Sequence, residues 1–497
     1  MVTTMDTLPY FDPALMIALP LLAAFLIPLL KRVSEAIPGY IPVLILGLNL
    51  YESIALLPYS LQKPVIVIIA AWQPPLGINL TIGPLGNILA LIISLVGFVV
   101  AIYNIKFVLE EPGEKYYMLY LLMIAGATGM VLTGDLFNLF VFLEITSISA
   151  YALTAFIRDR NGAEAAFKYL LIGSIASTMI LLGIALIYAT TGTLNIADIA
   201  RKIGQVDTRI TLAALILLIV GFGVEAEIFP LNGWAPDAYS QAPTPVGAVF
   251  GGIVVKAGVY GLARVIYTIF NFEGIFHFIL IMGVITLLMA EMSAIRQKQI
   301  KRMLAFSSIG QMGLVLIALG VATQEAVTGG LFQMFNHALI KPLLFLAAGY
   351  LVYYSGSKDI KDLDGMGKIK PVTSFFFAFG AFALMGLPPL NGFWSKLIII
   401  SETVNAGFIL VAALALAGSI IEAVYYLRVV GRLYFKSSED QVKTKYVHAS
   451  AVVAMSILAG LALFAGLFPD VVIHYLQPAA RELMDKTHYI QSVMALK

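Results

Sequence analysis

The sequence predicts an all-α polytopic membrane protein with about fourteen transmembrane helices. Of its 497 residues, 60% are hydrophobic and only 12% are charged, whereas soluble domains carry about 25% charged residues. Apolar runs near the length that crosses a bilayer, about 20 residues, recur from end to end. No stretch between them is long enough to form a separate soluble domain.

Composition excludes several other classes of protein. The formal net charge of +2 is too small to suggest a nucleic-acid partner, and the chain has no cysteine, which rules out disulfides and thiolate-ligated clusters. The first apolar segment precedes Lys31 and Arg32 rather than following basic residues, so we interpret it as a retained helix and not as a signal peptide. Nucleotide-binding and hydrolase motifs are absent. We therefore expect no catalytic residue, metal site or cofactor in this chain.

The predicted spans follow one another with three distinctive segments between or after them. Residues 196–203 have apolar positions at helical spacing and predict a short amphipathic surface helix. Residues 356–370 predict a polar loop, and 479–497 a terminal surface helix. The spans are predicted at 12–31, 38–62, 84–109, 116–133, 136–157, 163–190, 210–240, 244–270, 274–295, 300–320, 325–355, 373–400, 405–435 and 447–475.

The seventh and twelfth spans contain prolines, which break a helix at a cost of about 3 kcal/mol or more. The motif "PLNGW" begins at Pro230, and "PLNGFW" begins at Pro389, 159 positions later and directly after Pro388. Arg264 and Arg428 are 164 positions apart, as are the segments "TGTLNIADI" and "SGSKDIKDL". Such an offset spans five helices, an odd number. It therefore predicts two inverted five-helix repeats, helices 4–8 and 9–13, with helices 7 and 12 broken.

These repeats divide the chain into four units. We expect an N-terminal three-helix segment at 1–115, a first repeat at 116–271, a second repeat at 272–436, and a final transmembrane helix with a C-terminal surface helix at 437–497. Short loops on one side are richer in Lys and Arg, and such loops face the cytoplasm. Both termini are therefore predicted on the outer side.

Ionisable side chains lie inside several of the apolar spans, where each costs about 2.5–3.5 kcal/mol unless it finds a partner or water. A single buried glutamate could be a helix–helix contact, and His337 could bond a neighbouring backbone group. A series of Glu and Lys at similar depth across both repeats instead suits proton relay, because burial and pairing alter their proton affinities in opposite senses. The residues predicted to translocate ions are Glu144, Glu225, Glu227, Lys256, His337, Lys341, Lys396 and Glu422.

The helix breaks fit the same interpretation. Inverted-repeat transporters place ion sites at discontinuous helices, so Pro230, Pro388 and Pro389 are predicted to mark two related conduits. Arg264 and Arg428 lie near helix ends, and we expect their long side chains to reach the membrane surface.

The motifs around these residues resemble a known family. "FLEITSISAYAL", "FPLNGWAPDAYSQAPTPVGAVF", "IKRMLAFSSIGQMG", "FNHALIKPLLFLAAG" and "GLPPLNGFWSK" are similar to the antiporter-like subunits of respiratory complex I. The family includes the D-type chain of Mrp-type sodium/proton antiporters and the large antiporter-like subunit of membrane-bound hydrogenases. The resemblance covers nearly the whole chain. It implies a fourteen-helix subunit that moves protons or sodium in a larger complex of the prokaryotic plasma membrane.

The resemblance also implies roles by position. Glu144 matches the family's glutamate of the fifth helix, and Lys256 matches its basic residue of the eighth. Lys341 and His337 match the pair of the eleventh helix, and Lys396 matches the lysine of the broken twelfth helix.

Three positions depart from the family pattern. Glu225 stands where the family usually has a lysine, and Asn232 and Gln311 stand where it usually has histidines. The first half of the chain therefore lacks the usual Glu–Lys pair. This acid-rich half could instead favour a cation, or use Lys256 as its partner.

Two classes of function remain open at this stage. In the first, the chain is the ion-pumping subunit of a redox-driven complex, with iron–sulfur clusters or nickel–iron in partner subunits of a peripheral redox module. In the second, it is the D-type subunit of a standalone Mrp antiporter. A monomeric solute transporter has less support, since no pair of spans shows a roomy polar pocket. The short C-terminal region resembles the N, M or D kind of subunit rather than the longer L or A kind.

Overall fold

The computed structural model describes residues 12–105, 113–436 and 447–494, and these are mostly helical. Its helices and strands are α1 Leu15–Leu30, α2 Ile37–Ser60, β1 Val65–Ile68, β2 Asn79–Ile82, α3 Pro84–Asn104, α4 Gly113–Leu132, α5 Leu136–Thr154, α6 Arg160–Thr191, α7 Ile196–Lys202, α8 Thr208–Glu225, α9 Ala235–Gln241, α10 Thr244–Val249, α11 Val255–Ala263, α12 Glu273–Ala294, α13 Ile300–Val321, α14 Gln324–Ser355, α15 Met366–Ile369, α16 Pro371–Met385, α17 Asn391–Asn405, α18 Ile409–Phe435, α19 Ala449–Leu467, α20 Pro469–Met484 and α21 Lys486–Met494. Short 3-10 turns lie at Ile69–Ala71, Ile203–Gln205 and Ile360–Leu363, and π-helical turns at Phe250–Val254 and Arg264–Phe270.

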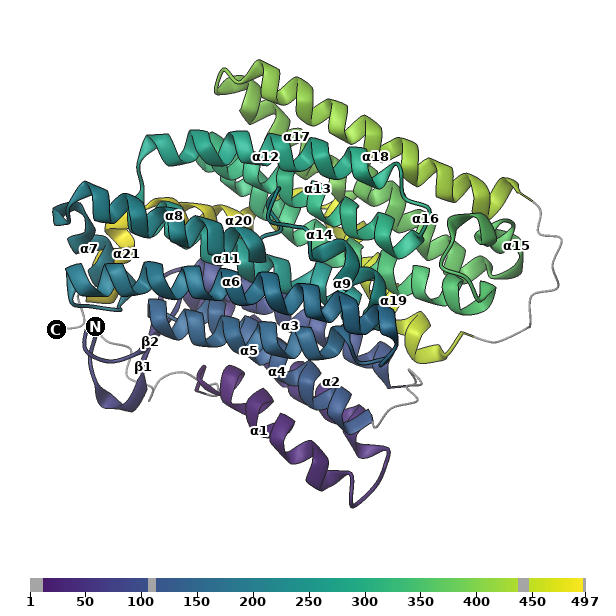
Figure 1. Ribbon diagram of the computed structural model, residues 1–497, viewed down its shortest axis with the longest axis horizontal. Coiled ribbons are helices and arrows are strands. Elements are labelled where there is room, and N and C mark those ends of the chain that lie inside the picture. Colours follow the sequence, from purple (N-terminus) through teal and green to yellow (C-terminus); the bar gives the residue numbers. More distant parts are fainter. Residues whose placement is uncertain (1–11, 106–112, 437–446, 495–497) are drawn as a thin grey trace.

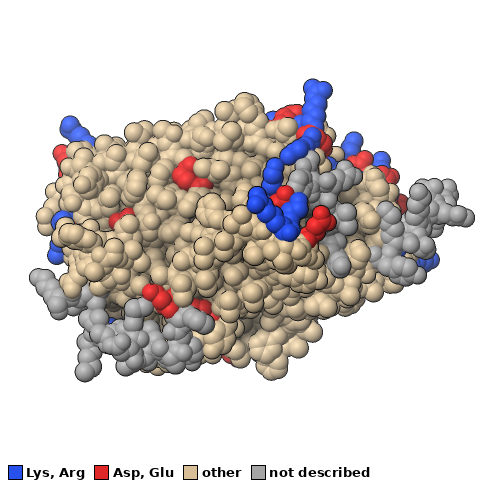
Figure 2. Space-filling model, turned by 90° about the horizontal axis from the view of Figure 1, so that it is seen from below, with Lys and Arg blue, Asp and Glu red and all other residues tan. Residues whose placement is uncertain are grey.

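The long helices lie side by side and form a bundle (Figure 1). Among the described residues, twelve helical segments are long and apolar enough to cross a bilayer, and α10, α11 and their π-helical turns count as one of them. Two further apolar helices are shorter, α1 with 16 residues and α16 with 15. Most of the face seen in Figure 2 is formed by uncharged side chains. The chain is therefore a helical multi-pass membrane protein, as predicted.

Local sequence signals set the ends of several helices. The Asp135 carboxylate accepts a hydrogen bond from the backbone N–H of Asn138 at the start of α5, at 2.8 Å. Asp159 caps α6 in the same way. Gly192 ends α6 with φ 67°, a left-handed conformation that glycine adopts without steric cost. These caps satisfy backbone groups that a helix end leaves unpaired.

The predicted interruptions and the predicted amphipathic helix are confirmed. Helix α8 ends at Glu225 and α9 begins at Ala235, so Pro230 lies in the turn between them. Helix α16 ends at Met385 and α17 begins at Asn391, with both remaining prolines in the turn. Helix α7 occupies nearly the whole of the segment predicted to lie on the surface, and its apolar side chains are buried.

The predicted helix boundaries near the C-terminus are wrong. The fourteenth predicted span is too long, because α19 ends at Leu467 and Pro469 begins the separate helix α20. Proline is favoured at the first turn of a helix, where its missing N–H has no partner to lose. Helices α20 and α21 replace the single predicted terminal helix, and α20 packs against α3 and α14. Residues 437–446, where the predicted last unit begins, and 106–109, the end of the third predicted span, lie outside the described residues.

An antiparallel hairpin was not predicted. Strands β1 and β2 pair Val65 with Ile82 and Ile68 with Asn79. The hairpin, α7 and α21 lie at one end of the bundle, and α15 lies at the other (Figure 1).

Isolated backbone bridges recur at a constant spacing. Asp135 pairs with Asn195, and Gln299 pairs with Asp359. Each member of the second pair follows its counterpart by 164 positions (299 − 135 and 359 − 195), the same offset that the sequence segments show. The two parts of the chain therefore share backbone contacts as well as sequence.

Candidate functional site

The first helix break directs two carboxylates into the protein interior. Glu225 is the last residue of α8, and Glu227 has φ 59°, a left-handed conformation that is uncommon for residues other than glycine. The backbone N–H groups of Ala226 and Ile228 bond carbonyls near the end of α8, at 2.8 and 2.9 Å. Both residues are buried: Glu225 is 3% exposed and Glu227 is 0% exposed.

Three predicted acids gather in this first half. Glu144 on α5 is partly buried and accepts a hydrogen bond from the hydroxyl of Ser177 on α6. The Glu227 carboxylate accepts a hydrogen bond from the Tyr239 hydroxyl at 2.5 Å. Both Glu144 and Glu227 act electrostatically on Glu225. Within the described ranges no group of three or more His, Cys, Asp or Glu side chains is placed to hold a metal ion.

Lys256 and His337 form the centre of the site. The Lys256 ammonium contacts the Gly251 carbonyl and the Nδ1 atom of His337. The other ring nitrogen of His337 lies 3.4 Å from the Ser308 hydroxyl. Lys256 and His337 are 1% and 0% exposed. The side chain in direct contact with Lys256 is therefore that of His337, while Glu227 acts on the lysine by charge.

Lys341 lies one helical turn after His337 on α14, and its partners are uncharged. Its ammonium donates to the Ser307 hydroxyl at 2.7 Å, to the Leu304 carbonyl at 3.1 Å and to the Tyr426 hydroxyl at 3.2 Å. An ammonium group has three N–H donors, and all three are used here. The lysine is thus a buried cation held by neutral oxygen atoms.

The second helix break places a cation against the end of a helix. Gly386, with φ 84°, caps α16. The Lys396 ammonium donates to the carbonyl of Met385, the last residue of that helix, at 3.4 Å, and forms an ion pair with Glu422 on α18. Positive charge is favourable at a helix C-terminus. Each break also contains a cis peptide bond before a proline: Phe229–Pro230 in the first and Pro388–Pro389 in the second.

A network of side-chain amides surrounds this ion pair. The Gln311 amide donates to Glu422 at 2.8 Å, and its oxygen accepts a hydrogen bond from Gln333. The Ser395 hydroxyl donates to Gln333 at 2.6 Å. Gln311 therefore links the second-half carboxylate to α14 and to the broken helix.

One buried carboxylate was missed by sequence reasoning. Glu291 on α12 is 0% exposed. Because it lies three residues before Ala294, the end of its helix, its position in the sequence is typical of a charge at the membrane surface. No neighbouring residue in the sequence marks it as buried, because the space for its carboxylate is left by Gly310 on the next helix, α13.

The expectation for Arg264 is wrong. Its side chain does not reach the membrane surface but is 2% exposed and forms an ion pair with Glu482 of α20 at 2.6 Å. Glu482 also accepts a hydrogen bond from the backbone N–H of Leu85 at 2.8 Å. Arg428, by contrast, donates to the exposed carbonyls of Ile295 and Gln297.

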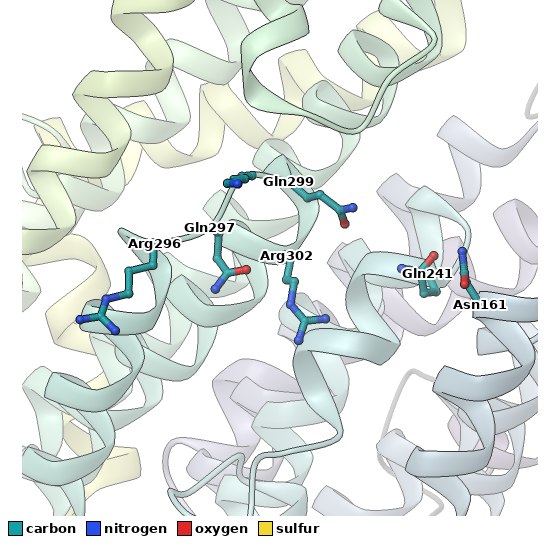
Figure 3. Close-up of a pocket in the computed structure, with 7 residues that line it drawn as sticks. Asn161, Gln241, Arg296, Gln297, Gln299 and Arg302 are labelled. Atoms are coloured by element: carbon teal, nitrogen blue, oxygen red, sulfur yellow. The ribbon is translucent and has the colours of Figure 1, made fainter.

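A polar cavity of about 510 Å³ opens at the junction of α6, α9, α12 and α13 (Figure 3). None of the predicted ion-translocation residues lines it. Its lining residues are Asn161, Gln241, Arg296, Gln297, Lys298, Gln299 and Arg302.

Comparison with known proteins identifies relatives over most of the chain. Residues 133–422 match the family model described as NADH:quinone oxidoreductase/Mrp antiporter, TM. The chain is 35% identical over 434 residues to the N-type subunit of the NADH-quinone oxidoreductase of Desulforudis audaxviator, covering 85% of this chain and 86% of that protein. It is 31% identical over 485 residues to the D-type subunit of the Na(+)/H(+) antiporter of Alkalihalophilus pseudofirmus, covering 95% and 97%.

A solved structure is similar over almost the full length. A chain of the membrane-bound sulfane sulfur reductase, an archaeal respiratory membrane complex, superposes with a TM-score of 0.92 at 41% identity, covering 97% of this chain and 99% of that chain. The structural neighbours are subunits of multisubunit membrane complexes. The chain belongs to the NADH:quinone oxidoreductase/Mrp antiporter membrane family, as an antiporter-like subunit of this kind of complex.

Proposed function

We propose that this subunit moves protons, sodium ions or both across the membrane along a line of buried ionisable side chains. The observation that carries the proposal is that these side chains form a continuous series. Successive members interact electrostatically or by direct contact, from the first break to the second. The line runs through Glu144, Glu225, Glu227, Lys256, His337, Lys341, Glu422 and Lys396.

Two features of the geometry support a proton route along this line. Charges in a low-dielectric interior interact strongly, so a proton gained by Glu227 changes how firmly Lys256 and Lys341 hold theirs. Lys341 releases its proton without breaking an ion pair, because its three partners are neutral oxygen atoms. Lys396 is held by Glu422, and movement at the second break would separate the two.

The proposed architecture has fourteen spans in inverted repeats. The twelve candidate spans together with α1 and the interrupted pair α16–α17 make up this number. Repeats at 116–271 and 272–436 are supported by the shared backbone bridges. Opposite orientation is supported by the ends of the bundle at which the matching segments lie. Helix α7 lies at one end, and the segment that matches it, Ile360–Leu363, leads directly into α15, which lies at the other end (Figure 1).

Orientation is proposed from the loops rich in lysine and arginine, with these loops inside a prokaryotic cell and both termini outside. Because the natural sequence has no cysteine, single cysteines can be introduced without a background. A cysteine at Lys298 should resist a membrane-impermeant maleimide in intact cells, and one at Lys202 should react. The reverse pattern would overturn the orientation.

We propose a redox-driven complex as the setting, supported by the higher identity to the sulfane sulfur reductase chain than to the antiporter chain. A standalone Mrp-type antiporter is the alternative. The redox cofactors would lie in partner subunits.

Purification of the native complex followed by iron and nickel analysis and transport assays in vesicles tests the setting. Stoichiometric iron, together with ion uptake that requires an electron donor, would support the redox-driven complex. A metal-free complex that exchanges sodium for protons when only a pH gradient is applied would favour the alternative. An isolated monomer that transports ions in liposomes would contradict both.

A further inference from the structure

Glu291 is a fully buried carboxylate that the proposed line of residues does not include. It is 0% exposed, and neither of its carboxylate oxygens has a hydrogen-bond partner among the described residues. Burial of a charge without a partner is strongly unfavourable. A buried acid retained in such surroundings requires an explanation other than the packing of helices.

The neighbouring helix is shaped to admit this carboxylate. A Cβ atom at Gly310 of α13 would lie 2.1 Å from one Glu291 oxygen, closer than any two such atoms approach. Only glycine leaves the space that the carboxylate occupies. The next residue, Gln311, holds the Glu422 carboxylate, so consecutive residues of α13 border the two acids.

Glu291 faces the second-half charges. Glu422, Lys396 and Lys341 all act on it electrostatically, and the Tyr425 hydroxyl faces it without reaching hydrogen-bond geometry. With Glu291 included, this buried group contains two carboxylates and two ammonium groups. Without it, the group would carry one excess positive charge when all its members are ionised.

We propose that Glu291 is a second proton-carrying carboxylate in this group, and the proposal rests on the proton-translocating function inferred above. When the ammonium of Lys341 or Lys396 releases a proton, the Glu291 carboxylate accepts it, which leaves a neutral amine and a neutral carboxylic acid. The proton returns when the ammonium re-forms. No electron transfer and no further reactant is involved.

The test compares Glu291→Gln, Glu291→Asp and the control Glu52→Gln, which removes a buried carboxylate from α2. Proton pumping is measured in vesicles and divided by the amount of assembled complex. We expect Glu291→Gln to lower pumping at least tenfold, Glu291→Asp to retain a substantial part of it, and Glu52→Gln to equal the parent. A merely structural role would be met by glutamine, which has the same shape.

Infrared difference spectra provide a second readout. A change in the C=O stretching band of a protonated carboxylic acid should accompany turnover and be lost in Glu291→Gln. Normal pumping and an unchanged band in that variant would overturn the role of Glu291. If Lys396→Ala is then inactive, the proposed function stands without Glu291. If Lys396→Ala and Glu291→Gln both pump normally, the proposed function itself fails.

Discussion

The two helix breaks share a sequence motif but carry opposite kinds of ionisable side chain, acidic at the first and basic at the second. At the first break the C-terminal end of α8 bears Glu225, with Glu227 close behind. At the second the C-terminal end of α16 meets Lys396. Backbone carbonyls give a helix C-terminus a partial negative charge, which favours a cation and opposes an anion. A helix C-terminus therefore stabilises the charged form of Lys396 at the second break and destabilises the charged form of Glu225 at the first.

The breaks also differ in the backbone carbonyl to which their tryptophan donates a hydrogen bond. The Trp234 indole donates to the carbonyl of Val224 in its own break, at 3.2 Å. The Trp394 indole donates instead to the carbonyl of Gly466 at the end of α19, at 2.8 Å. The tryptophan of the first break is thus hydrogen-bonded to the helix that ends at the same break. The tryptophan of the second break is hydrogen-bonded to α19, which comes later in the chain. The same sequence motif therefore has two different structural surroundings.

The largest effect is expected from Lys396→Ala, which removes the cation from the second break. We expect proton transport to be abolished. Glu422 would also be left buried and unpaired, at a cost of about 3–5 kcal/mol. Vesicle pumping per assembled complex is the measurement, with Lys298→Ala, an exposed lysine, as the control.

The double variant Lys396→Ala with Glu422→Gln separates transport from folding, because neither member of this ion pair is then left charged without the other. It should assemble like the parent and remain inactive. Recovery of pumping in this variant would show that Lys396 serves only to neutralise Glu422.

The matching glycines of the two motifs should respond very differently to alanine. A Cβ at Gly392 would lie 2.0 Å from the Ala383 carbonyl oxygen, whereas a Cβ at Gly233 meets nothing within 4 Å. Gly392→Ala should destabilise the protein by about 3 kcal/mol, and Gly233→Ala should be neutral or stabilising by about 0.5 kcal/mol. Thermal unfolding of the two purified variants measures this contrast, and equal effects would mean that the breaks are not packed differently.

Glu225 tests whether the acidic character of the first break matters. Glu225→Lys introduces the lysine that the family resemblance leads us to expect and places a cation at the end of α8, so we expect assembly and pumping to be kept. Any dependence of transport on sodium should decrease, because an acidic group has been replaced by a basic one. Pumping with and without sodium is compared for Glu225→Lys and Glu225→Gln. If Glu225→Gln stops all ion movement while Lys396→Ala does not, the conduit runs through the first half.

The smallest effect concerns the surface segments that precede the breaks. Burial opposes ionisation of Asp198 on α7, but hydrogen bonds from Lys202 and Arg201 and their charges lower its pKa below the usual value. Its stabilising contribution, about 1 kcal/mol, is therefore complete above the ordinary aspartate pKa of about 3.9 and is lost as pH falls through the lowered one.

Asp198→Asn should lower stability slightly at pH 7, and its deficit relative to the parent should shrink in acid. The matched variant Asp362→Asn removes a carboxylate that accepts a hydrogen bond from the neutral Ser357 hydroxyl, so its effect should be smaller still. Thermal unfolding at pH 7 and at about pH 2, well below the ordinary aspartate pKa, measures both. A deficit of Asp198→Asn that grows in acid would contradict the assignment.

How much the sequence revealed depended on whether the signal was local. The two breaks and α7 were predictable, because proline and helical periodicity act on the residues that carry them. The α1-to-α18 order of apolar segments was predictable for the same reason. The hairpin was not, since the apolar residues of β1 read as a continuation of the loop after α2, and its partner strand starts only at Asn79.

Long-range pairs were beyond the reach of the sequence. Nothing near Arg264 indicates that its partner is 218 positions away, and nothing near Glu291 indicates the space left by Gly310. The individual charged residues Lys396 and Glu422 were predicted, but their ion pair depends on how α17 packs against α18. Charge within an apolar span predicts that a residue matters, whereas tertiary packing decides which partner it has.

The buried ion pair between Arg264 and Glu482 also constrains how the chain is made. Arg264 enters the membrane with the first half, long before the ribosome has synthesised α20. Until Glu482 docks, the nascent protein must hold an uncompensated guanidinium, which is costly inside a bilayer. Because the same carboxylate also bonds the start of α3, its arrival joins early and late parts of the chain in a single step. We expect the helices to reach their final packing only after translation ends, when α20 docks against Arg264 and α3.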